Sequence, residues 1–254
     1  MLHTLSVQYH ENYENAAYTA AIPPAIRMYT AEELRRRRIL AGTVTLQKKP
    51  VYDVLKRIGD IVCAVGALVV LSPLLLGTCA AIIVNDFGSP IYSQMRIGKD
   101  GKPFRIYKFR SMYKDADARR EALMEQNECK GANFKIKDDP RITPVGHILR
   151  KTSIDELPQL WNVLKGDMSF IGYRPERQYY IDRIMECNPR YRYLYQIRPG
   201  VTSYATLYNG YTDTLDKMLT RLDLDLYYLR NHSLWFDARV LGMTFLGIVT
   251  GKKF

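Results

Sequence analysis

An uncharged apolar run dominates the pattern of hydrophobic and polar positions along the chain. Residues 61–84 include no charged side chain. These 24 residues would extend about 36 Å as a helix, enough to cross a hydrocarbon core of about 30 Å. Ser72-Pro73 lies in the middle of the run, where proline bends a helix and serine can satisfy the freed backbone groups. The pattern therefore predicts a membrane helix with a bend at Ser72-Pro73.

Basic residues flank this run on both sides. They are Arg35–Arg38, Lys48, Lys49, Lys56 and Arg57 before it, and Arg96, Lys99, Lys102, Arg105, Lys108 and Arg110 after it. Because cytoplasmic loops carry the excess of Lys and Arg, both ends are expected in the cytoplasm. A re-entrant helix that returns to the same face agrees with both signals, and a plain spanning helix is the alternative. Lys56, Arg57 and Asp60 then lie at the membrane interface, where charge is tolerated.

The rest of the chain has the pattern of a small β-hairpin followed by helices. Two β-like runs, 90–98 and 103–110, flank Lys99–Lys102, whose composition is typical of a hairpin turn. Helical patterns cover 115–128, 157–164, 175–187, 213–231 and 234–250, and 138–146 looks like a loop. Residues 234–250 are strongly apolar but include charges, so we expect this helix to lie in the membrane surface. The predicted fold is mostly α with a small β-hairpin (α+β), carrying interfacial amphipathic helices.

Three parts are predicted along the chain. Residues 1–48 form an N-terminal arm with a basic helix, residues 49–86 a re-entrant membrane helix, and residues 87–254 a cytoplasmic domain. The basic helix begins at Thr30 with a capping-box pattern, and its arginine run at Arg35–Arg38 favours contact with anionic lipid headgroups. No signal peptide is predicted, because no short apolar core with a cleavage site follows the arginines.

Composition narrows the choice of partner. The net charge of +11 predicts an anionic partner, which is nucleic acid, a phospholipid surface or a phosphorylated substrate. The apolar run favours the last two. The four cysteines are far apart and show no C-x-x-C spacing, so we interpret them as reduced thiols.

Two adjacent acids, Asp155 and Glu156, are the strongest candidates for chemistry. They follow Arg150 and precede an apolar helical pattern in which Pro158 fits only the first turn. With either Ser153 or Asp155 as the N-cap, both carboxylates lie at a helix N-terminus, where free N–H groups and the helix dipole favour ionisation. The plain alternative is a capping box formed by Ser153 and Glu156.

Several basic residues could bind a phosphate near these acids. Arg174 follows a tight loop and comes just ahead of a predicted helix, which suits phosphate binding. Lys108 and Arg110 share one face of a predicted strand and could bind one anion together. A solvated surface is the alternative for these two residues.

Ordered sequence motifs link these features. They are Lys56-Arg57-x-x-Asp60, Ser72-Pro73, Gln94-x-Arg96-x-Gly98, Tyr107–Met112, Gly146–Arg150, Ser153–Asn162, Gly166–Ser169, Arg174-Pro175 and Arg198-Pro199-Gly200. Together they resemble the bacterial sugar transferase family, the monotopic phosphoglycosyl transferases. The resemblance covers residues 50–200 closely and the C-terminal part more loosely.

The resemblance implies an activity and a location. Members transfer a sugar-1-phosphate from a UDP-sugar to polyprenyl (undecaprenyl) phosphate and release UMP, which initiates assembly of exopolysaccharide, capsule, lipopolysaccharide or another surface glycan. The expected location is the cytoplasmic face of the bacterial inner membrane. The partners implied are UDP-sugar, polyprenyl phosphate and membrane phospholipid but no nucleic acid, and homo-oligomerisation is left open.

The resemblance also implies residue roles. Asp155 would be the nucleophile that forms an aspartyl sugar-phosphate, and Glu156 would help to hold Mg²⁺. Arg150 and Arg174 are the first candidates for phosphate binding, followed by Lys108 and Arg110.

This chain departs from the family pattern in two places, and a function of another class stays open. Tyr173 stands where members commonly have proline, and the stretch 202–210 is divergent; we expect that stretch to contribute to sugar or uridine selection. The alternative function is a membrane-anchored binding protein or a scaffold of a glycan assembly complex. An Asp155→Asn variant discriminates, because only an enzyme would lose turnover.

Overall fold

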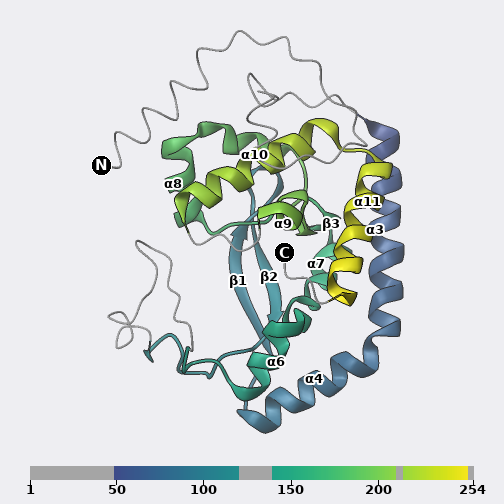
Figure 1. Cartoon of the computed structure of the whole chain (residues 1–254). Helices are drawn as coiled ribbons and strands as arrows, with labels where there is room; N and C mark the ends of the chain where they lie inside the picture. Colours follow the sequence, from purple (N-terminus) through teal and green to yellow (C-terminus); the bar gives the residue numbers. More distant parts are fainter. Residues whose placement is uncertain (1–48, 120–138, 210–213, 251–254) are drawn as a thin grey trace. The chain divides into compact units, whose positions relative to one another are not determined.

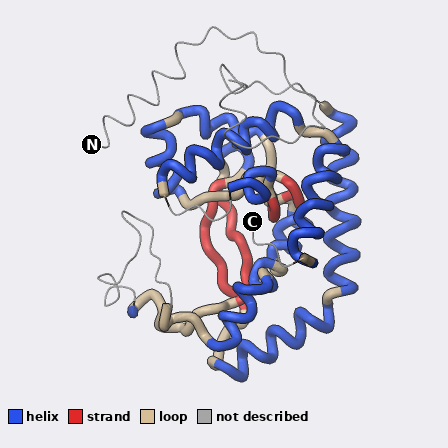
Figure 2. The backbone as a smooth tube through the Cα atoms, viewed as in Figure 1, coloured by secondary structure: helices blue, strands red, loops and turns tan. Residues whose placement is uncertain are grey.

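The computed structural model describes residues 49–119, 139–209 and 214–250 of the 254-residue chain. This part is mostly helical with two small sheets (Figure 2), which confirms the predicted mostly α class with a β-hairpin. The predicted basic helix that begins at Thr30, and most of the predicted helix 115–128, lie outside the described residues.

The apolar run forms two helices that meet at a sharp bend. Helix α3 (Pro50–Val70) and helix α4 (Ser72–Asn85) are bent by 62° relative to one another, as the Ser72-Pro73 pair predicts. Ser72 begins α4, and its hydroxyl donates to the Val69 carbonyl at 2.8 Å. Within the described residues, this bent pair has the length and apolar composition for a broken or re-entrant membrane segment, and no helix passes that test alone.

The β-hairpin follows directly. Strand β1 (Ile91–Ile97) pairs with strand β2 (Pro103–Phe109), and the turn η1 (Lys99–Gly101) joins them. Asp100 and Gly101 both have positive φ, at 58° and 69°. This is a conformation that Gly adopts freely and that Asp and Asn tolerate better than most residues. The predicted hairpin is therefore confirmed, including its turn.

Two compact units make up the structure. The first unit takes in the described parts of residues 1–58, 96–104 and 167–254, and the second unit takes in those of residues 59–95 and 105–166. Each unit draws on segments that are distant in sequence, and each is described below by itself.

In the second unit, helix α6 (Pro144–Thr152) packs on α4 (Figure 1). Ile82 of α4, Phe109 of β2 and Leu149 of α6 form their common core. The prediction of a loop over 138–146 is wrong at its end, because α6 begins at Pro144. Thr143 caps this helix by accepting from the Gly146 N–H at 2.9 Å, and proline is well tolerated in a first turn because its missing N–H has no partner there.

The first unit is built around helix α10, which lies beside helices α8 and α9 (Figure 1). Its elements are β3 (Ser169–Ile171), α8 (Gln178–Cys187), η4 (Pro189–Gln196), β4 (Gly200–Thr202), α9 (Tyr204–Asn209), α10 (Leu215–Asn231) and α11 (Leu234–Val249). Strands β3 and β4 are parallel, with Ser169 opposite Gly200 and Ile171 opposite Thr202. The predicted helices 213–231 and 234–250 are confirmed as α10 and α11.

The divergent stretch 202–210 contributes to the core of the first unit. Tyr204 and Ala205 of α9 are fully buried, and the Tyr204 ring packs against the rings of Tyr227 and Phe236. At least two residues of this stretch therefore belong to the core of the first unit.

Candidate functional site

Asp155 and Glu156, the acid pair, lie in a short 3₁₀ turn. Helix α6 ends at Ser153, whose φ of 58° is left-handed. The turn η3 (Ile154–Glu156) follows, and helix α7 (Gln159–Lys165) begins three residues after Glu156. The acids thus follow Ser153 in the first turn of a 3₁₀ helix, and the prediction is wrong in placing them at the N-terminus of the apolar helix, which is α7. The capping box does not form either, since the Ser153 side chain makes no capping hydrogen bond.

Lys108 of β2 forms an ion pair with Glu156. Its Nζ atom lies 2.5 Å from Glu156 Oε1, and both side chains are mostly buried. Lys108 and Glu156 are far apart in the sequence and meet in the second unit. The predicted strand face named Lys108 as a possible anion ligand but could not name Glu156 as its partner.

Asn162 of α7 holds this strand in place. Its side chain is fully buried, its Oδ1 atom accepts from the Tyr107 N–H at 3.1 Å, and its Nδ2 atom donates to the Arg105 carbonyl at 2.7 Å. Asn162 thereby fixes the backbone on both sides of Ile106, just before Lys108. The sequence showed Asn162 only as the last residue of a motif. An amide between the apolar residues Trp161 and Val163 is the signal that could have singled it out.

Arg150 approaches the acid pair from the last turn of α6. Its Nε atom donates to Ser111 Oγ at 2.8 Å. The backbone around Ser111 is itself fixed, because the Thr143 N–H donates to the Ser111 carbonyl at 3.1 Å. Arg150 is exposed, so it can present its guanidinium to a ligand.

Opposing effects act on the ionisation of Asp155. Burial raises the pKa of its carboxyl and the charge of Glu156 raises it further, whereas the positive charges of Lys108 and Arg150 lower it. The net result is a raised pKa. The expected net preference for the ionised form is therefore wrong for Asp155, because desolvation of the carboxylate outweighs the groups that lower its pKa, its own backbone N–H among them.

Arg110 has a different acidic partner. Its Nη1 atom lies 3.6 Å from Asp86 Oδ2, and its Nη2 atom donates to the Asp86 carbonyl. Lys108 and Arg110 thus contact separate carboxylates, Glu156 in the acid pair and Asp86 at the end of α4.

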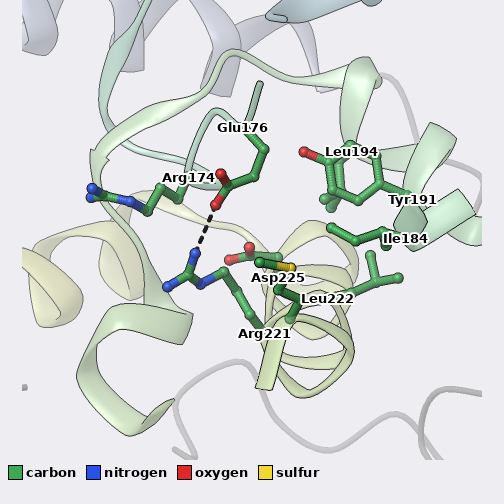
Figure 3. A pocket seen from close by; sticks show the side chains of 9 residues that line it. Arg174, Glu176, Ile184, Tyr191, Leu194, Arg221, Leu222 and Asp225 are labelled. Atoms are coloured by element: carbon green, nitrogen blue, oxygen red, sulfur yellow. Dashed lines mark hydrogen bonds and ion pairs between the residues drawn. The ribbon is translucent and has the colours of Figure 1, made fainter. Parts of the chain in front are cut away.

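Arg174 lies in the first unit, between β3 and α8. It lines a pocket together with Glu176, Tyr191, Arg221 and Asp225 (Figure 3). The predicted helix 175–187 begins later, at Gln178, because Arg177 is still extended. Arg174 is therefore held by a loop.

Of the predicted membrane-anchor residues, Lys56 forms the best-defined contacts. Its Nζ atom lies 2.8 Å from Asp237 Oδ2 of α11, an oxygen that also accepts from Tyr52 at 2.8 Å. The other carboxylate oxygen of Asp237 accepts from the Tyr228 hydroxyl at 2.5 Å. Lys56 thus binds a protein carboxylate within the first unit.

The other anchor residues differ in exposure. Arg57 is partly buried, Asp60 is buried, and Ser72 and Pro73 are exposed at the bend. The predicted interfacial location of Asp60 stays a prediction, although its burial shows that other side chains or backbone cover it.

Residues 51–251 match the family model described as bacterial sugar transferase. The chain belongs to this family. The resemblance inferred from the ordered motifs is thereby confirmed over most of the sequence.

Curated sugar transferases of known name align with the same region. The chain is 40% identical over 207 residues to the UDP-N-acetylgalactosamine-undecaprenyl-phosphate N-acetylgalactosaminephosphotransferase of Aeromonas hydrophila, covering 82% of this chain and 46% of the relative. It is 38% identical over 211 residues to the UDP-glucose:undecaprenyl-phosphate glucose-1-phosphate transferase of Escherichia coli, covering 79% and 43%. A Caulobacter vibrioides protein of the same name is 37% identical over 200 residues, covering 78% and 71%. The chain thus spans less than half the length of the first two relatives.

Glu156 is the residue of this sugar transferase that was predicted to help hold Mg²⁺. Among residues 49–119, 139–209 and 214–250, no group of three or more His, Cys, Asp or Glu side chains is placed to hold a metal by itself. Mg²⁺ usually takes one or two protein carboxylates and completes its shell with water and substrate phosphates. A single carboxylate such as that of Glu156 is compatible with this kind of site.

Proposed function

We propose that this sugar transferase moves a sugar-1-phosphate from a UDP-sugar to undecaprenyl phosphate and releases UMP. The observation that carries the proposal is the acid pair, with Lys108 bonded to Glu156 and Arg150 acting on Asp155, inside a chain that matches the family over residues 51–251. The names of the relatives support a UDP-sugar as the donor and undecaprenyl phosphate as the acceptor.

Asp155 acts as the nucleophile in this proposal. Its carboxylate oxygen attacks the β-phosphorus of the UDP-sugar, the bond from that phosphorus to the bridging oxygen breaks, and UMP leaves with the electron pair. A phosphate oxygen of undecaprenyl phosphate then attacks the aspartyl sugar-phosphate, and Asp155 leaves as a carboxylate. Burial strips water from the nucleophile, and the positive charges of Lys108 and Arg150 favour its ionised form.

The pyrophosphate of the donor is negatively charged, so its approach to the two carboxylates of the acid pair requires cations nearby. Glu156 would hold Mg²⁺ together with the donor phosphates, and the ion when bound supplies charge neutralisation for the pyrophosphate. Arg150 binds phosphate oxygens from the end of α6, and Lys108 keeps Glu156 in place through its ion pair. Arg174 is proposed as a second phosphate ligand.

A membrane location follows from the lipid acceptor. We place residues 49–86 in the cytoplasmic leaflet of the bacterial inner membrane as a re-entrant segment, with residues 87–254 on the cytoplasmic side. Many apolar side chains of α3 and α4 are exposed, among them Val62, Val69, Leu76 and Val84, and burying them in lipid is favourable. Exposed Trp235 and Phe245 support an interfacial location for α11. Such a protein would initiate a surface glycan.

Release of UMP tests the proposal. Detergent-purified protein is incubated with Mg²⁺, undecaprenyl phosphate and a panel of UDP-sugars, beside Asp155→Asn. We expect UMP from one donor, loss of release on chelation, and a decrease of about 10³-fold or more in the variant, since nucleophile removal has effects of that order. Asp115→Asn is the matched control, because Asp115 lies in an exposed i,i+4 pair with Arg119.

A second measurement separates an unsuitable donor from an inactive protein. Labelled UDP-sugar without acceptor should leave a sugar-phosphate bound to Asp155. If folded protein gives neither UMP nor a labelled Asp155 with any donor, the transferase proposal fails and the scaffold function is favoured.

A further inference from the structure

Residues 108–111, at the end of β2 and just after it, contact the candidate site at two places. Lys108 Nζ lies 2.5 Å from Glu156 Oε1, and Ser111 Oγ accepts from Arg150 Nε at 2.8 Å. All of these residues belong to the second unit. A displacement of this short segment would therefore move the groups that hold both Glu156 and Arg150. We call residues 108–111 the linking segment.

Arg110 ties the linking segment to the end of α4. Its Nη1 atom lies 3.6 Å from Asp86 Oδ2, and its Nη2 atom donates to the Asp86 carbonyl. Its own N–H donates to the Pro90 carbonyl at 2.8 Å. Asp86 in turn ends α4, because its N–H donates to the Ile82 carbonyl at 3.0 Å. The side chain and the backbone of Arg110 thus both contact residues 86–90, which join α4 to β1 (Figure 1).

This loop packs closely against the Arg110 side chain. Gly88 has a φ of 138°, and a Cβ atom added there would lie 2.7 Å from Lys114 Cε and 3.1 Å from Arg110 Nη1. The Lys114 N–H also donates to Asp86 Oδ2 at 3.2 Å. The Arg110 side chain is only 12% exposed. Its guanidinium is therefore bound to protein atoms, an arrangement that favours a link within the protein over the predicted binding of a phosphate.

Lys108 lies between two fixed points of the backbone. On one side the Tyr107 N–H donates to Asn162 Oδ1 at 3.1 Å, and on the other side Arg110 is bound to the loop after α4. A lysine ammonium is a point charge on a flexible stem, so the place of its charge depends on the backbone that carries it. Loss of the second fixed point would let Lys108 shift away from Glu156.

We propose that Arg110 is a positioning residue for the proposed transfer. By binding the end of α4, it fixes the backbone of Lys108 and Ser111. These two side chains then hold Glu156 and Arg150 beside the nucleophile. This inference rests on the proposed function. It also means that the end of the apolar helix pair sets the position of the candidate site.

Hydrogen exchange of the backbone over residues 105–113 tests the positioning without any substrate. We expect Arg110→Gln to raise the exchange rate of the linking segment by about tenfold, because one charge-assisted hydrogen bond fewer resists local opening. Asp86→Asn weakens the same contact from the other side and should raise the rate as well. It serves as the second variant if Arg110→Gln does not fold.

Lys114→Gln is the matched control. Lys114 is exposed beside the same loop, and its replacement removes the same charge as Arg110→Gln. The N–H that it donates to Asp86 belongs to the backbone and stays in place. This variant should therefore keep the exchange rate and the turnover of the unmodified protein.

UMP release then tests whether the position of the linking segment matters for turnover. Arg110→Gln should lower kcat/KM for the donor by about 10- to 100-fold, since a displacement of about 1 Å has effects of that order. In a Lys108→Gln background the decrease should be at least about threefold smaller, because a group that Arg110 positions is already gone. A purely structural role of Arg110 would give the same decrease in both backgrounds.

Two results would overturn the inference. They are an unchanged exchange rate in both Arg110→Gln and Asp86→Asn, and an equal loss of kcat/KM with and without Lys108. A protein whose exchange rate rises in both variants but that never releases UMP with any donor would contradict only the proposed function.

Discussion

In the proposed mechanism Asp155 has to be both desolvated and ionised, and these requirements conflict. A buried carboxylate is a better nucleophile because fewer water molecules hold it, yet burial favours the protonated form. Lys108 and Arg150 oppose the rise in pKa that burial and Glu156 cause, and the net pKa stays raised. Lys108 acts on both acids, because it is bonded to Glu156 and its charge also reaches Asp155.

Replacing Lys108 by Gln should therefore move the acid limb of turnover to higher pH. The variant loses the positive charge that lowers the pKa of Asp155, while burial and the charge of Glu156 still raise it, so the pKa of Asp155 rises further. Because the ionised form attacks, turnover then falls at a higher pH than in the unmodified protein. We expect a shift of about one pH unit, measured as kcat/KM for the donor from pH 5 to 8.

Lys99→Gln serves as the control for this shift. Lys99 is exposed in the hairpin turn, and its removal changes the net charge equally. An acid limb that moves equally in both variants would show that overall charge, and not the contact with Glu156, is responsible.

At the residue scale, the sequence predicted which residues lie near one another better than it predicted their geometry. Adjacent acids after a basic residue singled out Asp155, Glu156 and Arg150, and a strand face singled out Lys108. The left-handed Ser153 that ends α6 could not be predicted, because a non-glycine residue with positive φ leaves no compositional signal. Nor does the residue pattern show how far Asp155 is buried, and burial is the main cause of its raised pKa.

Among the elements, α6 is positioned by a close backbone approach. A Cβ atom on Gly146 would overlap the Ser111 backbone carbonyl, so only glycine lets the start of α6 lie this close to residue 111. The contact matters for the site, because Ser111 Oγ accepts from Arg150 at the far end of the same helix. Both ends of α6 therefore depend on the position of Ser111.

Gly146→Ala should destabilise the protein by about 1–3 kcal/mol, which is typical of overpacking against atoms that cannot move. Helix propensity alone would favour alanine by up to about 1 kcal/mol. The sign of the change in the free energy of unfolding therefore tests the close contact with Ser111. Thermal unfolding in detergent measures this change in stability. Gly242→Ala is the matched control, since no atom lies within 4 Å of a Cβ added there in α11. Equal stability of the two variants would contradict the close approach.

Element prediction succeeded where periodicity was long and failed where it was short. Helices α10 and α11, the hairpin and the bend at Ser72-Pro73 follow from local patterns. Helix α6 spans only nine residues, and Pro140 before it and Pro144 at its first position are equally typical of a loop. The capping role of Thr143 depends on φ and ψ values that the residue types do not specify.

At the scale of the whole molecule, the contacts that sequence could not predict join distant segments. Lys56 and Asp237 are 181 positions apart, and Lys108 and Glu156 are 48 apart. The local hydrophobic pattern carries no information on such pairs, so Lys56 was predicted as an interfacial anchor residue and Lys108 as a candidate phosphate ligand, and neither acidic partner was foreseen. The first contact holds the start of α3 against α11, and the second forms part of the candidate site.

The topology of the whole protein depends on the bend between α3 and α4. Basic residues precede α3 and follow α4, and the 62° bend allows both ends to remain on the cytoplasmic face. In a cysteine-free background, we expect Lys49→Cys and Lys99→Cys to react with an impermeant maleimide only when the cytoplasmic face is open. A cysteine at Leu71, beside the bend, should resist the reagent from both faces because it lies in hydrocarbon. Modification of positions 49 and 99 from opposite faces would show that the segment spans the membrane and would contradict the re-entrant topology.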